Sequence, residues 1–408
     1  MRKKTLFYFL ATFAALLNVI SISLDTIVES VYVPDPWLYG LLNFYIGSFT
    51  GFFIVLFLSL RYKNKIIGQF LDPNFKGFRF LTRDEITLHI LAGIGNAISS
   101  AGYFVIVTST KDPSTILPYT QLVIIYLVIG DTIIEKDTPS ILEIQSLLMV
   151  SLGALLASIS PYGEIYIREF IIVLFVINTG KMLLILSQRK LRVLRVQNRR
   201  VDSITIRIWN LLITTGFFSL IVIFINPAYL LASINYLIGY IFWLIFAIMT
   251  IVFVAQIAYI RALGIGKSSI TQAVNSVSIL FGLIASAILS TIMPNIFAPI
   301  ALNPQIFLIK IIGIIFVAFG IFSLATGEVK AYVFVRVKPG PQKHIMDQLW
   351  KIRGVKTVSA VAGAYDFILM VRLRALGKAY SRIIRKIEKI KEIEDFEWYS
   401  ILKEYEEI

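Results

Sequence analysis

The chain has 408 residues, of which 57% are hydrophobic and 16% are charged, and its mean hydropathy is +0.79, which excludes an ordinary soluble protein and indicates a membrane protein. The formal net charge of +14 comes from short basic clusters between apolar runs, which orient helices in a lipid bilayer, so we expect no nucleic acid as a partner. With no cysteine and only His89 and His344, the sequence excludes disulfides, iron–sulfur clusters and thiol catalysis, and we expect no metal and no cofactor.

Ten apolar runs follow one another over residues 1–326, and each is near the roughly 20 residues that a membrane-spanning helix needs. They lie near 5–24, 37–60, 85–108, 113–130, 141–160, 167–188, 204–225, 237–262, 268–291 and 306–326. We interpret the first run as a membrane helix and not as a cleaved signal peptide, because no small-residue cleavage site follows it. The sequence thus predicts a polytopic α-helical membrane domain of about ten transmembrane helices over 1–326.

Basic residues concentrate at the N-terminus and in alternate loops, above all those after the second and sixth runs. They are Arg2, Lys3, Lys4, Arg61, Lys63, Lys65, Lys76, Arg79, Arg83, Arg189, Lys190, Arg192, Arg195, Arg199 and Arg200. Because Lys and Arg are retained on the cytoplasmic side, we expect a multi-pass protein of the cell membrane with both termini in the cytoplasm. An odd number of helices would place the charged C-terminal segment outside, against this pattern.

A faint internal repeat relates the two ends of the membrane domain. At one constant spacing, Tyr103, Lys111 and Thr115 match Tyr259, Lys267 and Thr271. This spacing aligns the third to fifth apolar runs with the eighth to tenth apolar runs. Five helices per half is an odd number, so the halves, about 1–160 and 167–326, would be inverted relative to each other.

The composition changes at Gly327, after which charges are frequent and strand-like alternation begins. We expect elements in the order βαββαβ, a ferredoxin-like domain over 330–408. The elements are strand 331–337, helix 341–353, strand 355–362, strand 365–373, helix 378–390 and strand 395–404. The second helix has an apolar stripe that would cover one face of the sheet, formed by Tyr380, Ile383, Ile384, Ile387 and Ile390. The opposite face would carry Tyr332, Phe334, Ile368 and Met370, too apolar to leave in water, and would meet a second copy.

Lys181 is the sharpest feature inside an apolar run, since it lies eight residues before Arg189 and therefore about 12 Å deep. An ammonium at that depth costs at least about 2.5 kcal/mol, so it should face a cavity or a partner. It would hold a carboxylate or phosphate of a substrate, with Asn178 and Thr179 nearby as hydrogen-bond donors. The alternative is that Lys181 snorkels to the cytoplasmic headgroups along its flexible stem.

Other polar side chains recur in these helices and need partners in lipid. We take as candidates for a substrate pathway Asn96, Tyr103, Tyr119, Gln121, Gln256, Gln272 and Asn275. They would either line a wet pathway or form hydrogen bonds between helices, which is the commoner use. Asp25 and Glu29 follow the first apolar run; they would serve proton coupling or lie at solvated loop ends, and we favour the second interpretation.

The segment Pro118–Ser158 runs from a helix through an acidic turn at Gly130 and Asp131 into a helix with Gln145 and Gly153. With the paired five-helix halves, it resembles the EamA-like branch of the drug/metabolite transporter superfamily over about residues 1–326. Asp131 stands where a Glu is usual, and the first helix lacks the usual aromatic–glycine pattern. Because of these departures, the resemblance predicts the fold but does not identify the transported substrate.

The C-terminal segment carries Pro339-Gly340 after the first strand, a Gly354-Val355 turn and a Gly363–Asp366 turn. With these motifs it resembles the effector-binding domain of the Lrp/AsnC family of amino-acid-responsive regulators. The resemblance implies dimerisation through the sheets and binding of a small effector, often an amino acid, near Gly363, Tyr365 and Asp366. The family's DNA-binding helix-turn-helix is missing, and a membrane domain occupies its place.

We therefore expect a secondary transporter of small organic metabolites, amino acids or related compounds, that a cytoplasmic amino-acid-sensing domain regulates or assembles. Its partners would be the lipid bilayer, a small-molecule substrate, an amino-acid effector and a second copy joined through 330–408. We find no set of residues in the sequence that resembles a catalytic site, so we do not expect an enzyme. No ATP-binding loop is found either, because Arg261 stands where the loop ending in Gly266-Lys267-Ser268 needs a glycine. The alternative is a membrane-anchored amino-acid sensor or assembly scaffold that transports nothing.

Overall fold

The computed structural model describes most of the chain and divides it into two compact units. The described residues are 3–63, 65–110, 113–135, 141–160, 162–164, 166–196, 199–236, 239–297, 303–326, 328–339, 342–352, 354–374, 383–384 and 386–400. The first unit comprises Met1–Pro139 and Gln145–Ile321, and the second comprises Ser140–Ile144 and Phe322–Ile408. Each unit is described by itself.

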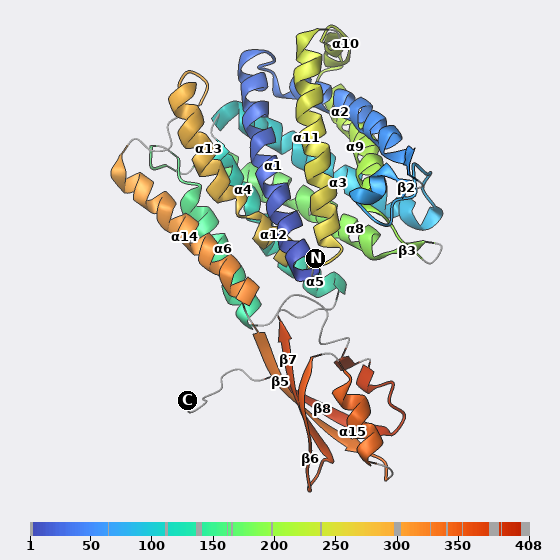
Figure 1. Cartoon of the computed structure of the whole chain (residues 1–408). Helices are drawn as coiled ribbons and strands as arrows, with labels where there is room; N and C mark the ends of the chain where they lie inside the picture. Colours follow the sequence, from blue (N-terminus) through green and yellow to red (C-terminus); the bar gives the residue numbers. More distant parts are fainter. Residues whose placement is uncertain are drawn as a thin grey trace. The chain divides into compact units, whose positions relative to one another are not determined.

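The first unit is a bundle of apolar helices (Figure 1). Its helices are α1 Lys3–Val31, α2 Pro36–Ser59, α3 Arg83–Thr110, α4 Pro113–Gln121, α5 Val123–Glu135, α6 Ile141–Ala157, α7 Ile167–Ile172, α8 Thr179–Val193, α9 Ser203–Ile225, α10 Ala228–Ile234, α11 Tyr240–Leu263, α12 Ser268–Asn275, α13 Ser278–Ile292 and α14 Pro304–Thr326. Between helices lie the short strands β1 Arg61–Tyr62, β2 Lys65–Ile66, β3 Arg195–Val196 and β4 Arg199–Arg200. Each of the ten expected runs contains helix.

By length and hydropathy, 8 helical stretches among the described residues could cross a membrane. Two shorter apolar helices, Leu117–Asp131 and Ile144–Ala157, occupy the fourth and fifth expected runs. The first unit is therefore that of a multi-pass membrane protein. Three of these stretches are irregular: α4 is separated from α5, α12 is separated from α13, and the π-helical segment Val173–Asn178 joins α7 to α8.

Packing in the bundle joins helices far apart in the sequence. The long helix α1 packs along α11, as Figure 1 shows, while α3 packs along α8 and α2 against α9. Glycines allow the closest approaches: a Cβ on Gly95 would lie 2.6 Å from the Gly180 carbonyl oxygen, and one on Gly313 would lie 2.6 Å from that of Gly153. Any side chain at these positions would push the paired helices apart, which is the usual reason for glycine in membrane helices.

The second unit contains a four-stranded antiparallel sheet with strand order β6-β7-β5-β8. Its elements are β5 Glu328–Val337, α15 Gln342–Trp350, β6 Val355–Ala360, β7 Phe367–Arg374 and β8 Ile393–Ser400. Part of the predicted second helix over 378–390 lies outside the described residues. Tyr380, Lys111, Gly327 and the end of the last predicted strand also lie outside them. Ile383, Ile387 and Ile390 are described and are buried in this unit's core.

The strands alternate as predicted between a buried and a more open face. Val333 and Val335 of β5 are fully buried, whereas Tyr332 pairs with Met370 and Phe334 with Ile368 on the partly exposed face. Alternation with period two puts every second side chain on the same face, so the four predicted apolar residues do lie together. The unit thus has an apolar core on one side of the sheet and a partly exposed apolar surface on the other.

Candidate functional site

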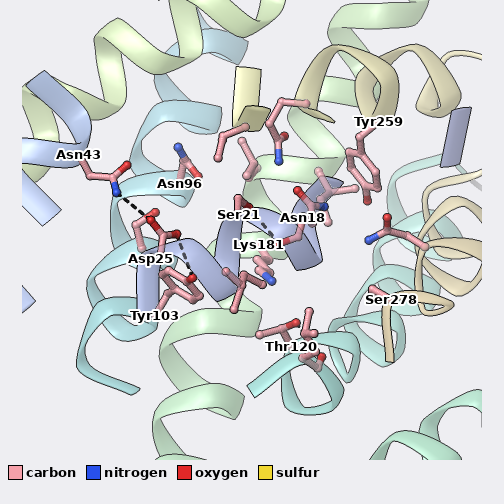
Figure 2. Close-up of a pocket in the computed structure, with 18 of the residues that line it drawn as sticks. Asn18, Ser21, Asp25, Asn43, Asn96, Tyr103, Thr120, Lys181, Tyr259 and Ser278 are labelled. Atoms are coloured by element: carbon pink, nitrogen blue, oxygen red, sulfur yellow. Dashed lines mark hydrogen bonds between the residues drawn. The ribbon is translucent and has the colours of Figure 1, made fainter. Parts of the chain in front are cut away.

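A cavity of about 220 Å³ lies inside the helical unit, and mostly polar side chains surround it (Figure 2). The lining side chains come from α1, α2, α3, α4, α8, α9, α11, α12 and α13. A polar cavity is unusual inside a bundle whose outer surface is apolar, because each polar group in lipid needs a partner. This cavity is our candidate functional site, and we build it from its charged and polar groups.

Asp25 of α1 contributes a buried carboxylate to the cavity wall, and its side chain is 6% exposed. The Tyr39 hydroxyl donates to Oδ1 at 2.5 Å and the Asn43 amide to the same oxygen at 3.3 Å, while the Tyr103 hydroxyl donates to Oδ2 at 3.2 Å. Figure 2 shows Asn43 and Tyr103 on either side of this carboxylate. All three donors are neutral, so no cation among the described residues pairs with Asp25.

Glu29 lies one helical turn after Asp25 and is 1% exposed. It accepts a hydrogen bond from the Thr108 hydroxyl, and its Oε2 atom has no hydrogen-bond partner among the described residues. The interpretation of Asp25 and Glu29 as solvated loop ends is therefore wrong. The reason is that α1 continues to Val31, seven residues past the end of the apolar run, and carries both acids into the bundle.

The two interrupted helices meet at Gln121, the last residue of α4. The Gln272 amide donates to Gln121 Oε1 at 2.6 Å, and the Ser276 hydroxyl donates to the same atom at 3.1 Å. The Gln121 amide in turn donates to the Ser278 hydroxyl at 3.3 Å, and the Tyr259 hydroxyl donates to Gln272 Oε1 at 2.6 Å. This chain of bonds joins α4, α11, α12 and α13 along one side of the cavity.

Among the described residues, two cationic side chains line the cavity, Lys181 of α8 and Arg207 of α9. Lys181 follows the π-helical segment Val173–Asn178 by three residues, and such segments often occur at functional sites. Arg207 is 5% exposed, and its Nε has no partner; its guanidinium lies 6.0 Å from the centre of the Phe253 ring. Within the described part of the chain, neither cation forms a hydrogen bond or an ion pair.

Two acid–arginine contacts lie near the end of α8 that follows Lys181. Asp131 accepts hydrogen bonds from the Ser269 backbone and hydroxyl at 3.0 and 2.8 Å and lies 3.3 Å from Arg189. Asp72 makes the corresponding bonds to the Ser203 backbone and hydroxyl, both at 2.8 Å, and lies 2.8 Å from Arg192. Each acid therefore ties the start of another helix, α12 or α9, to the last turns of α8.

Most of the predicted pathway residues lie around this cavity. Those that line it are Lys181, Asn96, Tyr103, Gln121, Gln256, Gln272 and Asn275. Asn178 and Tyr119 do not. Tyr119 is two residues from Gln121 and so lies on the opposite face of α4, with its ring 5.9 Å from that of Phe170. Asn178 ends the π-helical segment, whose wider turn changes the register between Asn178 and Lys181.

Several residues that line the cavity are not among those predicted for the substrate pathway. They are Asn18, Ser21, Asp25, Asn43, Gln188, Arg207 and Tyr259. A signal existed for Arg207, since it is a charge inside an apolar run, but its position near the start of that run resembled a solvated helix end. No signal in the sequence identified the asparagines, because isolated amides also occur at helix contacts.

The predicted effector turn of the second unit has a mainly structural set of contacts. The Asp366 carboxylate accepts a hydrogen bond from the Val337 backbone at 2.8 Å, and the Arg336 guanidinium donates to the Ala364 carbonyl at 2.8 and 3.0 Å. A Cβ on Gly363 would meet nothing within 4 Å, and its φ is not positive. Neither the backbone conformation nor the surroundings of the turn therefore require a glycine at 363.

Tyr365 belongs to an aromatic and charged cluster on the more open face of the sheet. Its ring lies 5.4 Å from that of Phe334 and 5.6 Å from the Arg336 guanidinium. The Tyr399 hydroxyl donates to Glu397 at 2.5 Å. Hydrogen bonds from Tyr399 and Tyr365 lower the pKa of Glu397, and the same bonds raise the pKa of both tyrosines. The cluster offers a hydroxyl, a carboxylate and a guanidinium at one surface.

Comparison with known proteins identifies the second unit. Residues 330–407 match the family described as the Lrp/AsnC ligand binding domain, so this segment is a domain of that kind. No curated protein matches the chain. A solved structure titled "Crystal structure of protein" is similar over 77% of this chain and 95% of its own, with 14% identity and a TM-score of 0.50. At that identity the similarity indicates a shared fold and nothing about activity.

Proposed function

We propose that this protein is a secondary transporter of small organic metabolites, amino acids or related compounds, which its Lrp/AsnC ligand-binding domain regulates or assembles. The observation that carries the proposal is the polar cavity, with Asp25, Lys181 and Arg207 in its wall inside an apolar bundle. One charged residue at the centre of a bilayer costs about 2.5–3.5 kcal/mol on the insertion scale. A bundle that only anchored a sensor would gain nothing from three such groups around a cavity.

The packing supports a membrane domain of ten crossings in two inverted halves. In such a duplication the first helix of each half would pack on the third helix of the other, and α1 packs on α11 while α3 packs on α8. The fourth helix of each half is interrupted, at α4–α5 and at α12–α13, and the interruptions meet through Gln121. Interrupted helices in corresponding places of two halves are typical of secondary transporters, whose substrate sites lie there.

The resemblance to the EamA-like branch of the drug/metabolite transporters agrees with this arrangement. We infer alternating access, in which the two halves rock around the cavity and expose it to each side in turn. The energy would come from an ion or substrate gradient. The basic loops favour cytoplasmic placement of both termini and of the Lrp/AsnC domain.

For the C-terminal domain, the strand order β6-β7-β5-β8 supports a ferredoxin-like arrangement. The apolar surface at Tyr332, Phe334, Ile368 and Met370 is where we place contact with a second copy. Regulation by an amino-acid effector requires that the effector bind one transport state better than the other, because equal binding shifts no equilibrium. Gly363, Tyr365 and Asp366 remain our candidates for effector contact.

The test is solute uptake by liposomes that contain the purified full-length protein. We expect uptake by the wild type and its loss in Lys181→Ala, because the ammonium faces the cavity. The matched control is Lys190→Ala, which removes an exposed lysine from the same helix and should leave uptake unchanged. Uptake that is absent in the wild type, or equal in Lys181→Ala, would favour the sensor or scaffold over the transporter.

A further inference from the structure

We propose that the solute bound in the cavity is an organic acid with a net negative charge, and that Lys181 and Arg207 hold its acid groups. The inference rests on the proposed function for the claim that the solute is transported. The binding site itself stands on the cavity. The proposed anion site has two cations, Lys181 and Arg207, where the sequence indicated Lys181 alone, and its ligand carries a negative charge.

The first step is the charge of the cavity wall. Among the described residues that line it, Asp25 is the acid, and Lys181 and Arg207 are the cations. A guanidinium and an ammonium are both charged at neutral pH. With Asp25 ionised, these described residues give the wall a net charge of about +1, and with Asp25 protonated, about +2. A neutral or cationic solute would leave this excess positive charge without compensation in a medium of low dielectric constant.

The second step is that these charges do not neutralise one another. The hydrogen bonds to the Asp25 carboxylate come from Tyr39, Asn43 and Tyr103, all of them neutral donors. Among the described residues Arg207 has no acceptor for its N–H groups, although only 5% of its surface is exposed. Buried charges in proteins are almost always paired, so an unpaired guanidinium at a cavity indicates that the partner is a ligand.

The third step is the chemistry that two cations in one cavity wall select. Lys181 of α8 and Arg207 of α9 both line the cavity. A guanidinium binds carboxylate and phosphate through paired N–H bonds, and an ammonium adds a point charge. Gln188 and Asn275 also line the cavity with buried amide oxygens that lack partners among the described residues, which leaves acceptors for a hydroxyl or amino group on the same solute.

The experiment measures ligand-induced thermal stabilisation of the purified full chain at constant ionic strength. The probes form two matched pairs that differ in charge: succinate with succinamide, and glycerol 3-phosphate with glycerol. None is an amino acid, so an effector bound to the Lrp/AsnC domain does not confuse the result. We expect a rise in the unfolding midpoint with at least one acid and none with its neutral counterpart, and the pair that responds distinguishes carboxylate from phosphate.

The variants are Lys181→Gln and Arg207→Gln, with Lys190→Gln as the control. Each cavity variant should raise the apparent Kd of the responding acid by at least about tenfold, because it removes one charge-assisted contact to the ligand. The control should bind like the wild type. Arg207→Lys keeps the charge without the fork and should bind with intermediate affinity, which provides a folded variant if Arg207→Gln unfolds.

Three outcomes overturn the proposal: no acid stabilises the wild type, the neutral partner stabilises it equally, or the acid binds both cavity variants unchanged. The same proteins in liposomes separate this inference from the proposed function. Acid binding that depends on both cations, without any uptake, supports the anion site and argues against a transporter. Uptake of a neutral solute that survives both substitutions supports a transporter and overturns the anion site.

Discussion

The side-chain amide of Gln272 donates a hydrogen bond of 2.6 Å to the side-chain oxygen of Gln121, and this bond joins the two interrupted helices of the membrane unit. Both residues line the cavity, so the point where the interruptions meet is part of the candidate site. A movement of one half relative to the other would have to stretch or exchange this bond. The Gln121–Gln272 pair is therefore where we expect substrate occupancy and helix movement to be coupled.

Gln272→Met should test that coupling, because it keeps the length of the side chain and removes its amide. Tyr259 then loses its acceptor and Gln121 loses a donor, and each lost hydrogen bond costs about 0.5–1.5 kcal/mol, more where a buried group is left unpaired. We expect uptake in liposomes to fall at least about tenfold. Gln145→Met, which changes an exposed glutamine of α6, is the control. Equal uptake by the two variants would show that the pair is only a packing contact.

Asp25→Asn should uncouple solute uptake from proton movement. The carboxylate lies in the cavity wall, and its hydrogen-bond donors among the described residues are neutral groups, so we expect it to exchange a proton during transport. A pH-sensitive dye inside the liposomes should report proton entry with solute in the wild type and in Asp84→Asn, an exposed control. The signal should vanish in Asp25→Asn. Persistence of the signal there would exclude Asp25 as the coupling group.

Asp72→Asn should destabilise the bundle at the end of α8. The Asp72 carboxylate is fully buried, lies 2.8 Å from Arg192 and accepts the Ser203 backbone N–H. Removing one charge of a buried pair costs about 3–5 kcal/mol because the other charge is left unpaired. We expect a lower unfolding temperature in detergent, and partial recovery when Arg192→Gln is added. Equal unfolding temperatures for the wild type and Asp72→Asn would show that the pair contributes little.

Glu397→Gln should change the alkaline titration of two tyrosines in the Lrp/AsnC domain. The Glu397 carboxylate accepts their hydroxyl bonds and raises the pKa of Tyr365 and Tyr399, so the neutral phenols are favoured in the folded domain. Their contribution to stability is present below the ordinary tyrosine pKa and is lost as the pH rises through the raised values. In Glu397→Gln, and not in Glu394→Gln, the difference absorbance of tyrosinate should appear at lower pH. Identical titrations would show that these bonds do not persist in solution.

The proposed topology is open to a direct test because the chain has no cysteine. A single cysteine at Lys65, in the loop after α2, should react with an impermeant maleimide only after the cells are permeabilised. A single cysteine at Tyr162, in the loop after α6, should react in intact cells, since an odd number of expected helices separates it from Lys65. Both side chains are exposed, so accessibility within the protein does not limit the reaction. The reverse pattern would place the termini outside the cell.

Much of the fold follows from local patterns in the chain. Apolar runs of about 20 residues predict the helices. The bilayer core holds no water to pair with backbone N–H and C=O groups, so the chain must form these hydrogen bonds internally. Alternation along 331–337 predicts a strand of the second unit and also which of its side chains face the core. The depth of Lys181 indicated a residue that faces a cavity or a partner, with snorkelling to the headgroups as the alternative, and the structure places it in the cavity wall.

The composition of the cavity depended on tertiary structure. Asp25 lies one residue past the end of the expected first helix, and only the continuation of α1 to Val31 shows that it is buried. Arg207 lies near the start of its apolar run, where helix ends are commonly solvated, and the packing of α9 against α2 and α3 is what encloses it. Hydropathy and alternation are properties of neighbouring residues, so the sequence determined the helices, the strands and the membrane class. Which of its polar side chains share one cavity is decided by how helices distant in the chain face each other, and only their packing sets that.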